Sequence, residues 1–334
     1  MSNLRLCITG GSGFIGTAAL QLALDRSLDV INFDIRPPKQ LSHQPYWKYV
    51  DIRDKSSFQE ALNTYSPTHI LHLAATTGMD IYDMSFFDAN TAGTQNLLDT
   101  ASSMHGLKRI VFTSSLLVCK NGHVPQLDNE YCPPNLYGES KVIGEKFFRN
   151  SSNPFEWVIV RPTSIWGPWF EHSYKTFFRV IDRGLYVQPG NQPITKPLSF
   201  VGNTVYMMFQ LLFHEGGKVN HQTYYLADYP QHSIQEWADI VRAEIGKSGK
   251  TPVFPIGLLR LLGKAGDVLK KVGWSDPPLT SFRLNNMLTG ARYPIEKTQS
   301  VVGPLPFSIR EGVKQTLQWM QQEKLLRSQL KIEN

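Results

Sequence analysis

Cysteine is scarce in this sequence. Cys7, Cys119 and Cys132 are the only three among 334 residues. Such a small, odd number gives no disulfide framework and suits the reducing cytoplasm. Their spacing is not that of a zinc site, so we predict that the protein binds no metal.

Long apolar runs and a leader segment are missing as well. No segment approaches the roughly 20 apolar residues that a membrane-spanning helix requires. The chain leads from Met1 into a strand-like segment without the basic flank, apolar region and cleavage site of a signal peptide. We therefore expect a cytoplasmic protein.

The sequence also lacks clusters of positive charge. The net charge of +6 and the pI of about 9.1 arise from basic residues that are spread along the chain. They form no Lys- and Arg-rich block interleaved with aromatics, so we predict no nucleic-acid partner. With 41% hydrophobic and 19% charged residues, the composition is that of a globular protein with a sizeable core. The length predicts two domains or one large α/β unit with an added lobe.

What is present begins with a glycine-rich turn. An apolar strand-like segment over 4–9 precedes the turn, and an amphipathic helix follows it through about Arg26. The glycines permit a tight turn and bring backbone N–H groups close to a diphosphate at the positive end of the helix. This order predicts a dinucleotide site. The expected contacts are Gly10, Gly13, Phe14, Ile15 and Gly16.

The acid that ends the next predicted strand indicates which dinucleotide is bound. Asp34 closes the segment 30–34, where a carboxylate can accept both ribose hydroxyls of the adenosine half and would repel a 2′-phosphate. Arg36 lies two residues further on and would attract that phosphate. We therefore predict NAD and leave NADP open.

Further apolar segments alternate with helical ones and complete a predicted parallel sheet. They lie at 46–50, 69–75, 109–115 and 155–161. His72 falls within one of them, and we interpret it as a packing residue. The strand ends supply additional predicted cofactor contacts, which are Asp51, Ile52, Leu73, Ala74, Ala75, Thr113 and Pro162.

Tyr137 and Lys141 lie four residues apart at the start of a predicted helix and therefore share one face. The lysine ammonium favours the phenolate form of the tyrosine, which can then exchange a proton with an alcohol or a ketone. The same spacing also arises by chance on exposed helices. Ser115, at a strand end, can face the tyrosine across a cleft, and Asn90 can brace the lysine or an ordered water.

The alternation of strands and helices fades after about residue 168. We therefore predict an α/β fold with a Rossmann-type doubly wound parallel sheet over 1–168, to which later segments return. A smaller substrate-binding lobe is predicted over 169–334. Within it, residues 255–274 place leucines and valines at helical spacing against a basic face. Such a helix either lies in the inner membrane interface or packs on its own domain, and both interpretations stay open.

Taken in order, the motifs are Gly10-x-x-Gly13-x-x-Gly16, Asp34, Asp51-Ile52, His72-Leu-Ala-Ala75, Asn90-x-x-Gly93-Thr94, Ser114-Ser115, Tyr137-x-x-x-Lys141 and Arg161-Pro162. This set, which spans nearly the whole chain, resembles the extended short-chain dehydrogenase/reductase family, in particular its sugar epimerases and ketoreductases. The resemblance implies that Tyr137 and Lys141 are catalytic. It also implies that Ser115 binds the reacting oxygen with help from Ser114, and that Asn90 supports the proton relay of the lysine.

Departures from the family pattern concern the substrate. Dehydratases of the family carry Asp-Glu beside the partner of the tyrosine, whereas this chain has Ser114-Ser115-Leu116. Ser164 stands where nucleotide-sugar enzymes usually place an asparagine, and Asn203 replaces an acid. The segment ending at Asn203 and the run 255–318 are similar to epimerases that act on N-acetylglucosamine attached to polyprenyl diphosphate. The predicted substrate contacts are Ser164, Lys196, Arg283 and Arg292.

The resemblance thus implies inversion at C4 of a diphosphate-linked sugar, nucleotide- or polyprenyl-linked and N-acetylated, through a transient 4-keto intermediate. An NAD(P)H-dependent 4-ketosugar reductase would use the same residues. A hydroxysteroid-type dehydrogenase and a non-catalytic dinucleotide sensor are further alternatives. Dimers are common in the family, so the resemblance also implies a homodimer through the helices of Asn90 and Tyr137.

Overall fold

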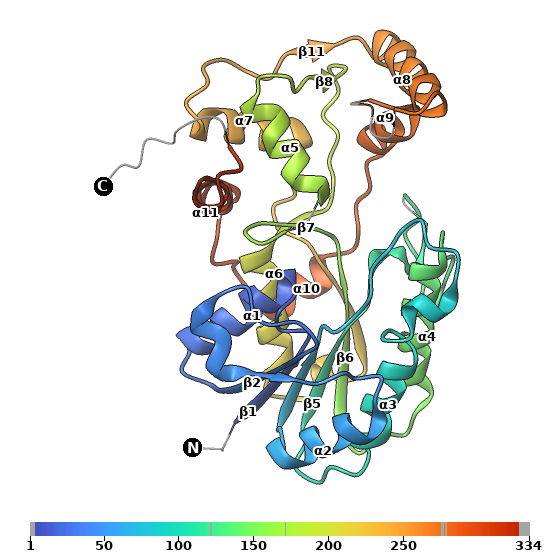
Figure 1. Cartoon of the computed structure of the whole chain (residues 1–334), viewed down its shortest axis with the longest axis vertical. Coiled ribbons are helices and arrows are strands. Elements are labelled where there is room, and N and C mark those ends of the chain that lie inside the picture. Colours follow the sequence, from blue (N-terminus) through green and yellow to red (C-terminus); the bar gives the residue numbers. More distant parts are fainter. Residues whose placement is uncertain (1–3, 121, 171, 275–276, 278, 327–334) are drawn as a thin grey trace. The chain divides into compact units, whose positions relative to one another are not determined.

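The computed structural model describes residues 4–120, 122–170, 172–274, 277 and 279–326 (Figure 1). The chain forms two compact units. Unit 1 comprises Met1–Ile165, Ser199–Tyr229 and Tyr293–Pro306, and unit 2 comprises Trp166–Leu198, Pro230–Arg292 and Phe307–Asn334. Two segments from the second half of the sequence therefore belong to the same unit as the N-terminal motifs.

Unit 1 is built on a seven-stranded sheet in which all neighbouring strands are parallel. The strand order is β10-β6-β5-β4-β1-β2-β3. The strands are β1 (Arg5–Thr9), β2 (Asp29–Asp34), β3 (Trp47–Tyr49), β4 (His69–His72), β5 (Arg109–Thr113), β6 (Glu156–Pro162) and β10 (Gln222–Leu226). This order confirms the predicted Rossmann-type, doubly wound sheet.

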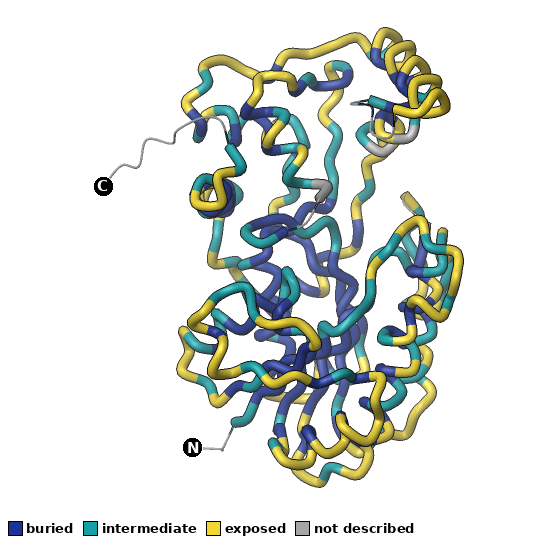
Figure 2. Tube along the Cα trace, in the orientation of Figure 1, coloured by how far each residue is buried: buried dark blue, intermediate teal, exposed yellow. Residues whose placement is uncertain are grey.

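Helices cover both faces of the sheet. One layer contains α1 (Phe14–Asp25), α6 (Val201–Leu212) and α10 (Glu296–Val302), and the other contains α2 (Lys55–Tyr65), α3 (Ala92–Ala101) and α4 (Leu136–Asn150). Between the sheet and the second layer lies a continuous hydrophobic core, visible as buried chain in Figure 2. Short 3₁₀ helices occupy Leu41–Tyr46 (η1), Met84–Phe87 (η2), Leu116–Val118 (η3) and Gly217–Val219 (η4).

The strand order reverses between β1 and β4, and this reversal sets the position of the site. The chain leaves β1 toward one side of the sheet and leaves β4 toward the other, so a crevice opens at their carboxyl ends. The glycine turn follows β1 directly, and residues 73–75 follow β4. The predicted cofactor contacts after these two strands therefore meet at one edge of the sheet.

Unit 2 consists mainly of helices packed through aromatic side chains. The helices are α5 (His172–Asp182), α7 (Ile234–Glu244), α8 (Ile256–Lys271), α9 (Ser281–Leu288) and α11 (Ile309–Gln322). Strand β8 (Gln188–Pro189) pairs with β11 (Val253–Phe254), and the chain also contains β7 (Ser164–Trp166) and β9 (Leu198–Phe200). Trp237 stacks on Phe177 with ring centroids 4.2 Å apart and lies 5.0 Å from Trp166. Among the described residues, no helix has the length and apolar character needed to cross a membrane.

Candidate active site

The turn after β1 is shaped for a backbone approach that only glycine allows. Gly10 has a φ of +76°, and a Cβ there would lie 2.6 Å from the backbone nitrogen of Ala74. A Cβ on Gly16 would overlap the carbonyl oxygen of Gly10. Gly13 then begins α1 without a side-chain cap, and the first turn of α1 carries no acidic residue, so the N–H groups at the positive end of this helix can meet an anion.

Asp34 lies against this turn at the end of β2. Its carboxylate accepts hydrogen bonds from the backbone N–H groups of Ser12, at 3.0 Å, and Arg36, at 2.9 Å. The side chain of Asp34 is buried, whereas that of Arg36 is exposed. The fold therefore fixes a carboxylate beside the glycine turn and leaves the nearby guanidinium in solvent, an arrangement that fits the ribose of NAD.

Asp51 and Ile52, the next predicted contacts, are already engaged within the protein. Arg53 donates to both carboxylate oxygens of Asp51, with the shortest bond at 2.6 Å, and this bond lowers the pKa of Asp51. Ile52 is buried against Gly93, where an added Cβ would lie 2.7 Å from the Ile52 side chain. Contact of either residue with adenine stays a prediction.

Thr113, at the end of β5, provides an independent indication of a ligand. Its Oγ1 is buried and has no hydrogen-bond partner among the described residues. A buried hydroxyl without a partner is costly unless a ligand or water completes it. Together with the half-buried Leu73, Ala74 and Ala75 after β4, Thr113 fits a polar, planar group such as a nicotinamide at the carboxyl ends of β4 and β5.

Ser115 and Tyr137 are brought together, as the sequence predicted. Asn135 caps α4 by accepting a hydrogen bond from the N–H of Gly138 at 2.9 Å, which fixes the first turn that carries Tyr137. Burial raises the pKa of Tyr137, and a hydrogen bond with the Ser115 hydroxyl partly offsets that effect. The phenol and the serine hydroxyl therefore form a pair that could hold one substrate oxygen between them.

Lys141 lies on the same helix as Tyr137, and the expectation that its ammonium favours the phenolate stays a prediction. In this structure burial raises the pKa of Tyr137. The Nζ of Lys141 donates to the carbonyl oxygen of Thr113 at 2.9 Å, which directs it to β5. Burial lowers the pKa of Lys141 to about 8, although Glu145 acts in the opposite direction. A pKa of about 8 keeps this lysine mostly protonated near neutral pH.

The expectation that Ser114 assists the reacting oxygen stays a prediction. The side chain of Ser114 is buried and donates to Oε1 of Glu145 at 2.6 Å. Glu145 in turn forms an ion pair with Arg161 at 2.8 Å, and both side chains are fully buried. Burial opposes charge on Glu145, but the bond to Arg161 outweighs it and holds the pKa of the carboxyl below its usual range.

The Glu145–Arg161 pair is the functional feature that the motif search missed. It joins α4 to β6 and, through Ser114, to the end of β5. The end of β5, which leads into Ser115, and α4, which carries Tyr137 and Lys141, are thereby fixed to each other and to β6. A signal was present in the sequence, because Glu145 lies four residues after Lys141 on the same buried helix face.

Asn90 lies next to the catalytic helix but does not bond to the lysine. Its amide nitrogen donates to the Thr76 carbonyl and to Ser140 Oγ, each at 2.9 Å, and its oxygen accepts from the N–H of Thr76 at 2.7 Å. Asn90 therefore holds α4 through the residue before Lys141. A role in a proton relay through water stays a prediction.

Asn203, which departs from the family pattern, pairs with a buried acid. It donates to Oδ1 of Asp228 at 3.0 Å, while the N–H of Phe200 donates to Oδ2 at 2.9 Å. Burial raises the pKa of Asp228 to about 7 despite these bonds. An asparagine at this position supplies a donor where a second carboxylate would repel the first.

Three of the four predicted substrate contacts belong to unit 2. Arg292 lines a pocket of about 320 Å³ whose wall also includes Thr195, the residue before Lys196. Burial lowers the pKa of Lys196. Arg283 is not part of this lining and donates to the Pro277 carbonyl at 2.6 Å. Ser164, in β7, is half-buried and belongs to unit 1.

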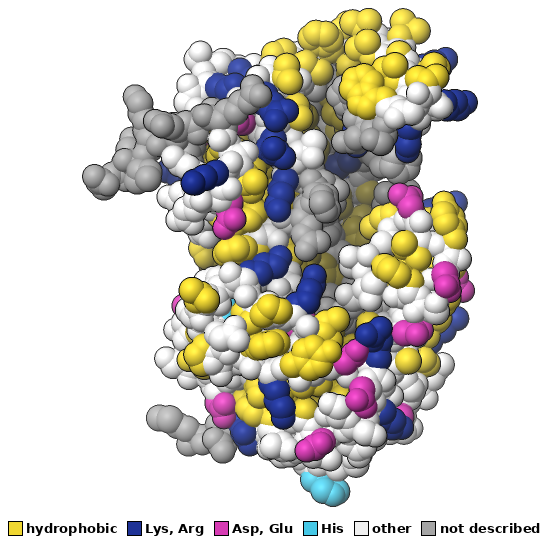
Figure 3. Space-filling model, in the orientation of Figure 1, with side chains coloured by type: hydrophobic (Ala, Val, Ile, Leu, Met, Phe, Trp, Pro, Cys, Tyr) yellow, Lys and Arg dark blue, Asp and Glu magenta, His cyan; other side chains and the backbone are white. Residues whose placement is uncertain are grey.

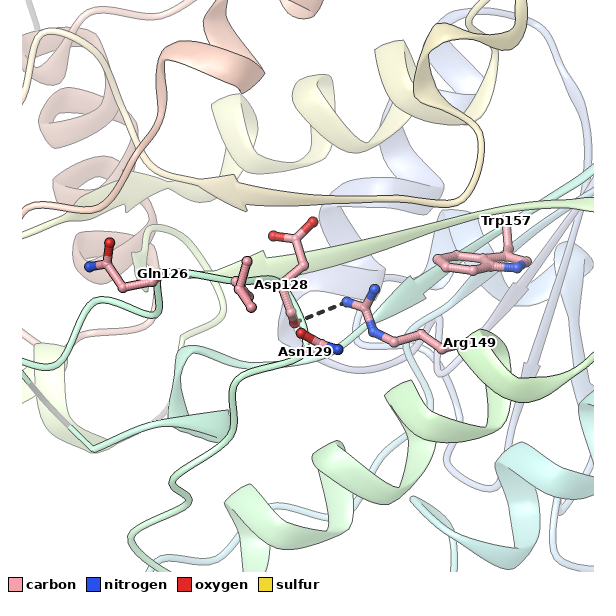
Figure 4. Close-up of a pocket in the computed structure, with 6 residues that line it drawn as sticks. Gln126, Asp128, Asn129, Arg149 and Trp157 are labelled. Carbon is pink, nitrogen blue, oxygen red and sulfur yellow. Dashed lines mark hydrogen bonds between the residues drawn. The ribbon is translucent and has the colours of Figure 1, made fainter.

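A second pocket, in unit 1, lies away from the predicted chemistry (Figure 4). Its volume is about 540 Å³, and its lining residues are Gln126, Leu127, Asp128, Asn129, Arg149 and Trp157. Arg149 points toward the backbone of the loop and donates to the Asp128 carbonyl at 3.2 Å. Arg149 is in the last turn of α4 whereas Tyr137 is in the first, so this pocket is not the cofactor site.

Comparison with known proteins identifies the family. Residues 6–202 match the model of the NAD dependent epimerase/dehydratase family. The chain belongs to this family. The match agrees with the observed site, in which the glycine turn, Asp34 and Thr113 fit a nicotinamide dinucleotide. The cofactor of this family member is therefore NAD, and the protein is an NAD-dependent epimerase or oxidoreductase.

Individual relatives have two kinds of activity. The chain is 28% identical over 326 residues to an N-acetyl-α-D-glucosaminyl-diphospho-ditrans,octacis-undecaprenol 4-epimerase of Escherichia coli O157:H7, with 95% of each chain covered. It is 29% identical to a 3-beta-hydroxysteroid dehydrogenase of Mycolicibacterium neoaurum, covering 73% of this chain and 70% of that one. Among solved structures, the Thermus thermophilus UDP-glucose 4-epimerase in complex with NAD has a TM-score of 0.68. It is 21% identical, covers 95% of this chain and 99% of its own, and so supports the fold.

Proposed function

We propose that this protein is an NAD-dependent C4 epimerase of a diphosphate-linked N-acetylhexosamine, acting through a transient 4-keto sugar. The observation that carries the proposal is the pairing of Tyr137, in the first turn of α4, with Ser115, which follows β5. Two residues before Ser115 lies the buried Thr113 hydroxyl. A phenol and a hydroxyl in this position suit the removal and return of a proton on one alcohol oxygen.

Ser115, Tyr137 and Lys141 have separate roles in this reaction. Ser115 holds the C4 oxygen, and Tyr137, ionised as the phenolate beside the ammonium of Lys141, accepts the C4 hydroxyl proton when the alcohol is oxidised and returns it when the ketone is reduced. Lys141, with its pKa of about 8, carries the positive charge that stabilises this phenolate near neutral pH. Bound NAD supplies the hydride acceptor and donor. For inversion the sugar ring must turn within the site, so the diphosphate has to provide most of the binding energy.

NMR of the product separates the epimerase from its nearest rival. Purified protein with NAD is incubated with UDP-N-acetylglucosamine and, separately, with N-acetylglucosaminyl diphosphate on a short polyprenol. We expect an axial C4 product with no net change in nicotinamide absorbance. A 4-ketosugar reductase would instead consume one reduced cofactor per product when given the 4-keto sugar, and that result without any epimer would overturn the proposal.

For the carrier of the sugar we propose a polyprenyl diphosphate at the membrane surface, and helix α8 supports this. Leu259, Gly263 and Gly266 are its buried residues. A Cβ on Gly263 would lie 3.2 Å from the N–H nitrogen of Ser281, so α8 packs on its own unit through a glycine face. The larger apolar side chains are left outside, namely Leu258, Leu261, Leu262, Val268, Leu269 and Val272, together with Trp274 beyond the helix.

The exposure of these side chains is large, reaching 66% at Leu261 and 74% at Val272. Figure 3 shows hydrophobic side chains gathered over α8, with Lys and Arg at the margin. Arg260, Lys264, Lys270 and Lys271 are exposed on the same helix. An apolar face bordered by cations suits the interface of an anionic bilayer, where the leucines enter the acyl region and the cations meet phosphates.

Sedimentation with vesicles tests this contact. We expect wild-type protein to pellet with vesicles containing phosphatidylglycerol at low salt, and less with neutral vesicles. The double variant Leu261→Glu/Val268→Glu should stay in the supernatant, whereas Leu41→Glu, at a 93% exposed leucine of η1, should pellet normally. Wild-type protein that stays wholly in the supernatant would contradict the membrane proposal while leaving the epimerase assay with UDP-sugars intact.

A hydroxysteroid dehydrogenase is the second candidate, because a relative of that activity matches 73% of the chain. It would use Tyr137 and Ser115 in the same manner on a sterol hydroxyl. Reduction of NAD by 3β-hydroxysteroids, together with no turnover of either sugar substrate, would favour it. The homodimer through α3 and α4 that the resemblance implies is likewise a proposal, and the mass of the protein in solution tests it.

A further inference from the structure

The loop between β5 and α4 gathers two cysteines and a histidine. One ligand atom from each of Cys119, His123 and Cys132 lies within 4.8 Å of the other two. An isolated parallel bridge joins Cys119 to Cys132, and the N–H of Cys132 donates to the Val118 carbonyl at 2.9 Å. The backbone thus brings side by side two thiols that are far apart in the sequence, which is why their spacing gave no indication of a metal site.

The surroundings of His123 are those of a metal ligand. One of its ring nitrogens, Nε2, lies 2.6 Å from Oε1 of Glu130, which leaves Nδ1 as the ring nitrogen for a metal. Metal-bound histidines commonly bond a carboxylate through their second nitrogen, and this fixes the ring and its tautomer. Glu130 is itself held, because its other oxygen accepts from the N–H of Gln126 at 2.7 Å.

We propose that Cys119, His123 and Cys132 bind a Zn²⁺ ion, with a water molecule in the fourth position. Two thiolates and one imidazole are ligands that Zn²⁺ prefers, and tetrahedral binding at about 2.0–2.3 Å places ligand atoms about 3.5–4 Å apart. The observed cluster needs only a small contraction to reach this geometry. On binding, the two thiols release two protons to solvent, and the resulting dithiolate neutralises the ion.

The ion would act as a structural clip beside the catalytic residues. Cys119 follows η3, which begins directly after Ser115, and Cys132 precedes the Pro133-Pro134 pair that leads into α4 and Tyr137. Cys119 is 2% exposed, whereas the side chain of His123 is 33% exposed and gives the ion a route in from solvent. The proposal does not depend on the substrate or on the direction of the reaction.

Metal titration of the full-length, reduced protein tests the site. We expect one Zn²⁺ per chain by elemental analysis, and Co²⁺ should give the visible bands of tetrahedral coordination with a thiolate charge-transfer band. Cys132→Ser should lose this spectrum. His123→Ala should also weaken binding, while His105→Ala, at an exposed histidine outside the cluster, should bind as wild type. Glu130→Gln should weaken binding by about 10–100-fold.

Three results would overturn the proposal. The first is a reduced wild-type protein that takes up no Zn²⁺ or Co²⁺ at micromolar concentration. The second is a folded Cys132→Ser or His123→Ala variant, checked by circular dichroism, that binds as tightly as wild type. The third is a Cys119–Cys132 disulfide found by mass in the native protein together with no metal uptake after reduction, which would assign the pair to redox chemistry.

Discussion

The region around Tyr137 in unit 1 and helix α8 of unit 2 satisfy opposite physical conditions. Around Tyr137, polar and charged side chains are buried, and each of Ser114, Lys141 and Glu145 has a defined partner. On α8, large apolar side chains such as Leu261 and Val272 are exposed. Buried polar groups and exposed apolar groups both cost free energy, and both are typical of function. We propose that the first arrangement fixes atoms for chemistry and that the second offers a surface for attachment.

The largest expected effect comes from removing the phenol. Tyr137→Phe deletes the group that exchanges a proton with the substrate, so kcat should fall by about 10²–10⁴-fold. NAD affinity, measured by fluorescence quenching, should be nearly unchanged because the glycine turn and Asp34 remain. Undiminished turnover by this variant would show that the polar cluster does not carry the chemistry.

Breaking the buried Glu145–Arg161 ion pair should lower the free energy of unfolding substantially. Glu145→Gln leaves Arg161 charged in a fully buried position, and removal of one partner of such a pair costs about 3–5 kcal/mol. Urea unfolding measures the loss. Glu139→Gln, at an exposed position on the same helix, is the matched control and should change the unfolding free energy by less than about 0.5 kcal/mol. Equal losses in both variants would contradict the assigned role of the pair.

A smaller and pH-dependent loss is expected from Asn203→Asp, which places a second carboxylate against Asp228. Because the pKa of Asp228 is raised to about 7, this acid holds a proton at pH 5 and can share it with its neighbour. Above pH 7 both carboxyls would be ionised and would repel. The variant should therefore lose about 1–3 kcal/mol at pH 8 and less at pH 5.

Thermal unfolding of this variant at the two pH values measures the difference. Asn63→Asp, at an exposed position of α2, serves as its control and should show no such trend. The wild-type protein already has the same sign of dependence from Asp228. The folded state binds a proton that the unfolded state releases between about pH 4 and pH 7, so the contribution of this group to stability falls as pH rises through that range.

The smallest effect on stability is expected on α8. Leu261→Glu/Val268→Glu replaces side chains that are 66% and 60% exposed, so the free energy of unfolding should change by less than about 0.5 kcal/mol per site. Chemical denaturation checks this, alongside the loss of vesicle binding. A drop of several kcal/mol would mean that these side chains are packed in the native protein, and the contrast between the two regions would disappear.

Local sequence determined much of the catalytic unit. The glycines at 10, 13 and 16, the acid at Asp34 and the pair Tyr137 and Lys141 each occupy an element that forms from near neighbours in the chain. Six strands of the sheet were predicted because each is a short apolar segment. Such signals can be read from sequence, since the apolar spacing of a strand or helix and the residue types of a turn are local properties of the chain.

Only the tertiary structure decided the contacts between distant segments. The pairing of Glu145 with Arg161, the partner of Asn203, and the gathering of Cys119 and Cys132 depend on how separate elements pack, and spacing along the chain does not encode that. The tertiary structure also places Lys141 against the carbonyl of Thr113. It leaves the leucines of α8 exposed, because the glycine face of this helix packs on its own unit. The sequence determines which polar and apolar side chains are present. The packing of distant segments determines which of them find hydrogen-bond partners or become buried.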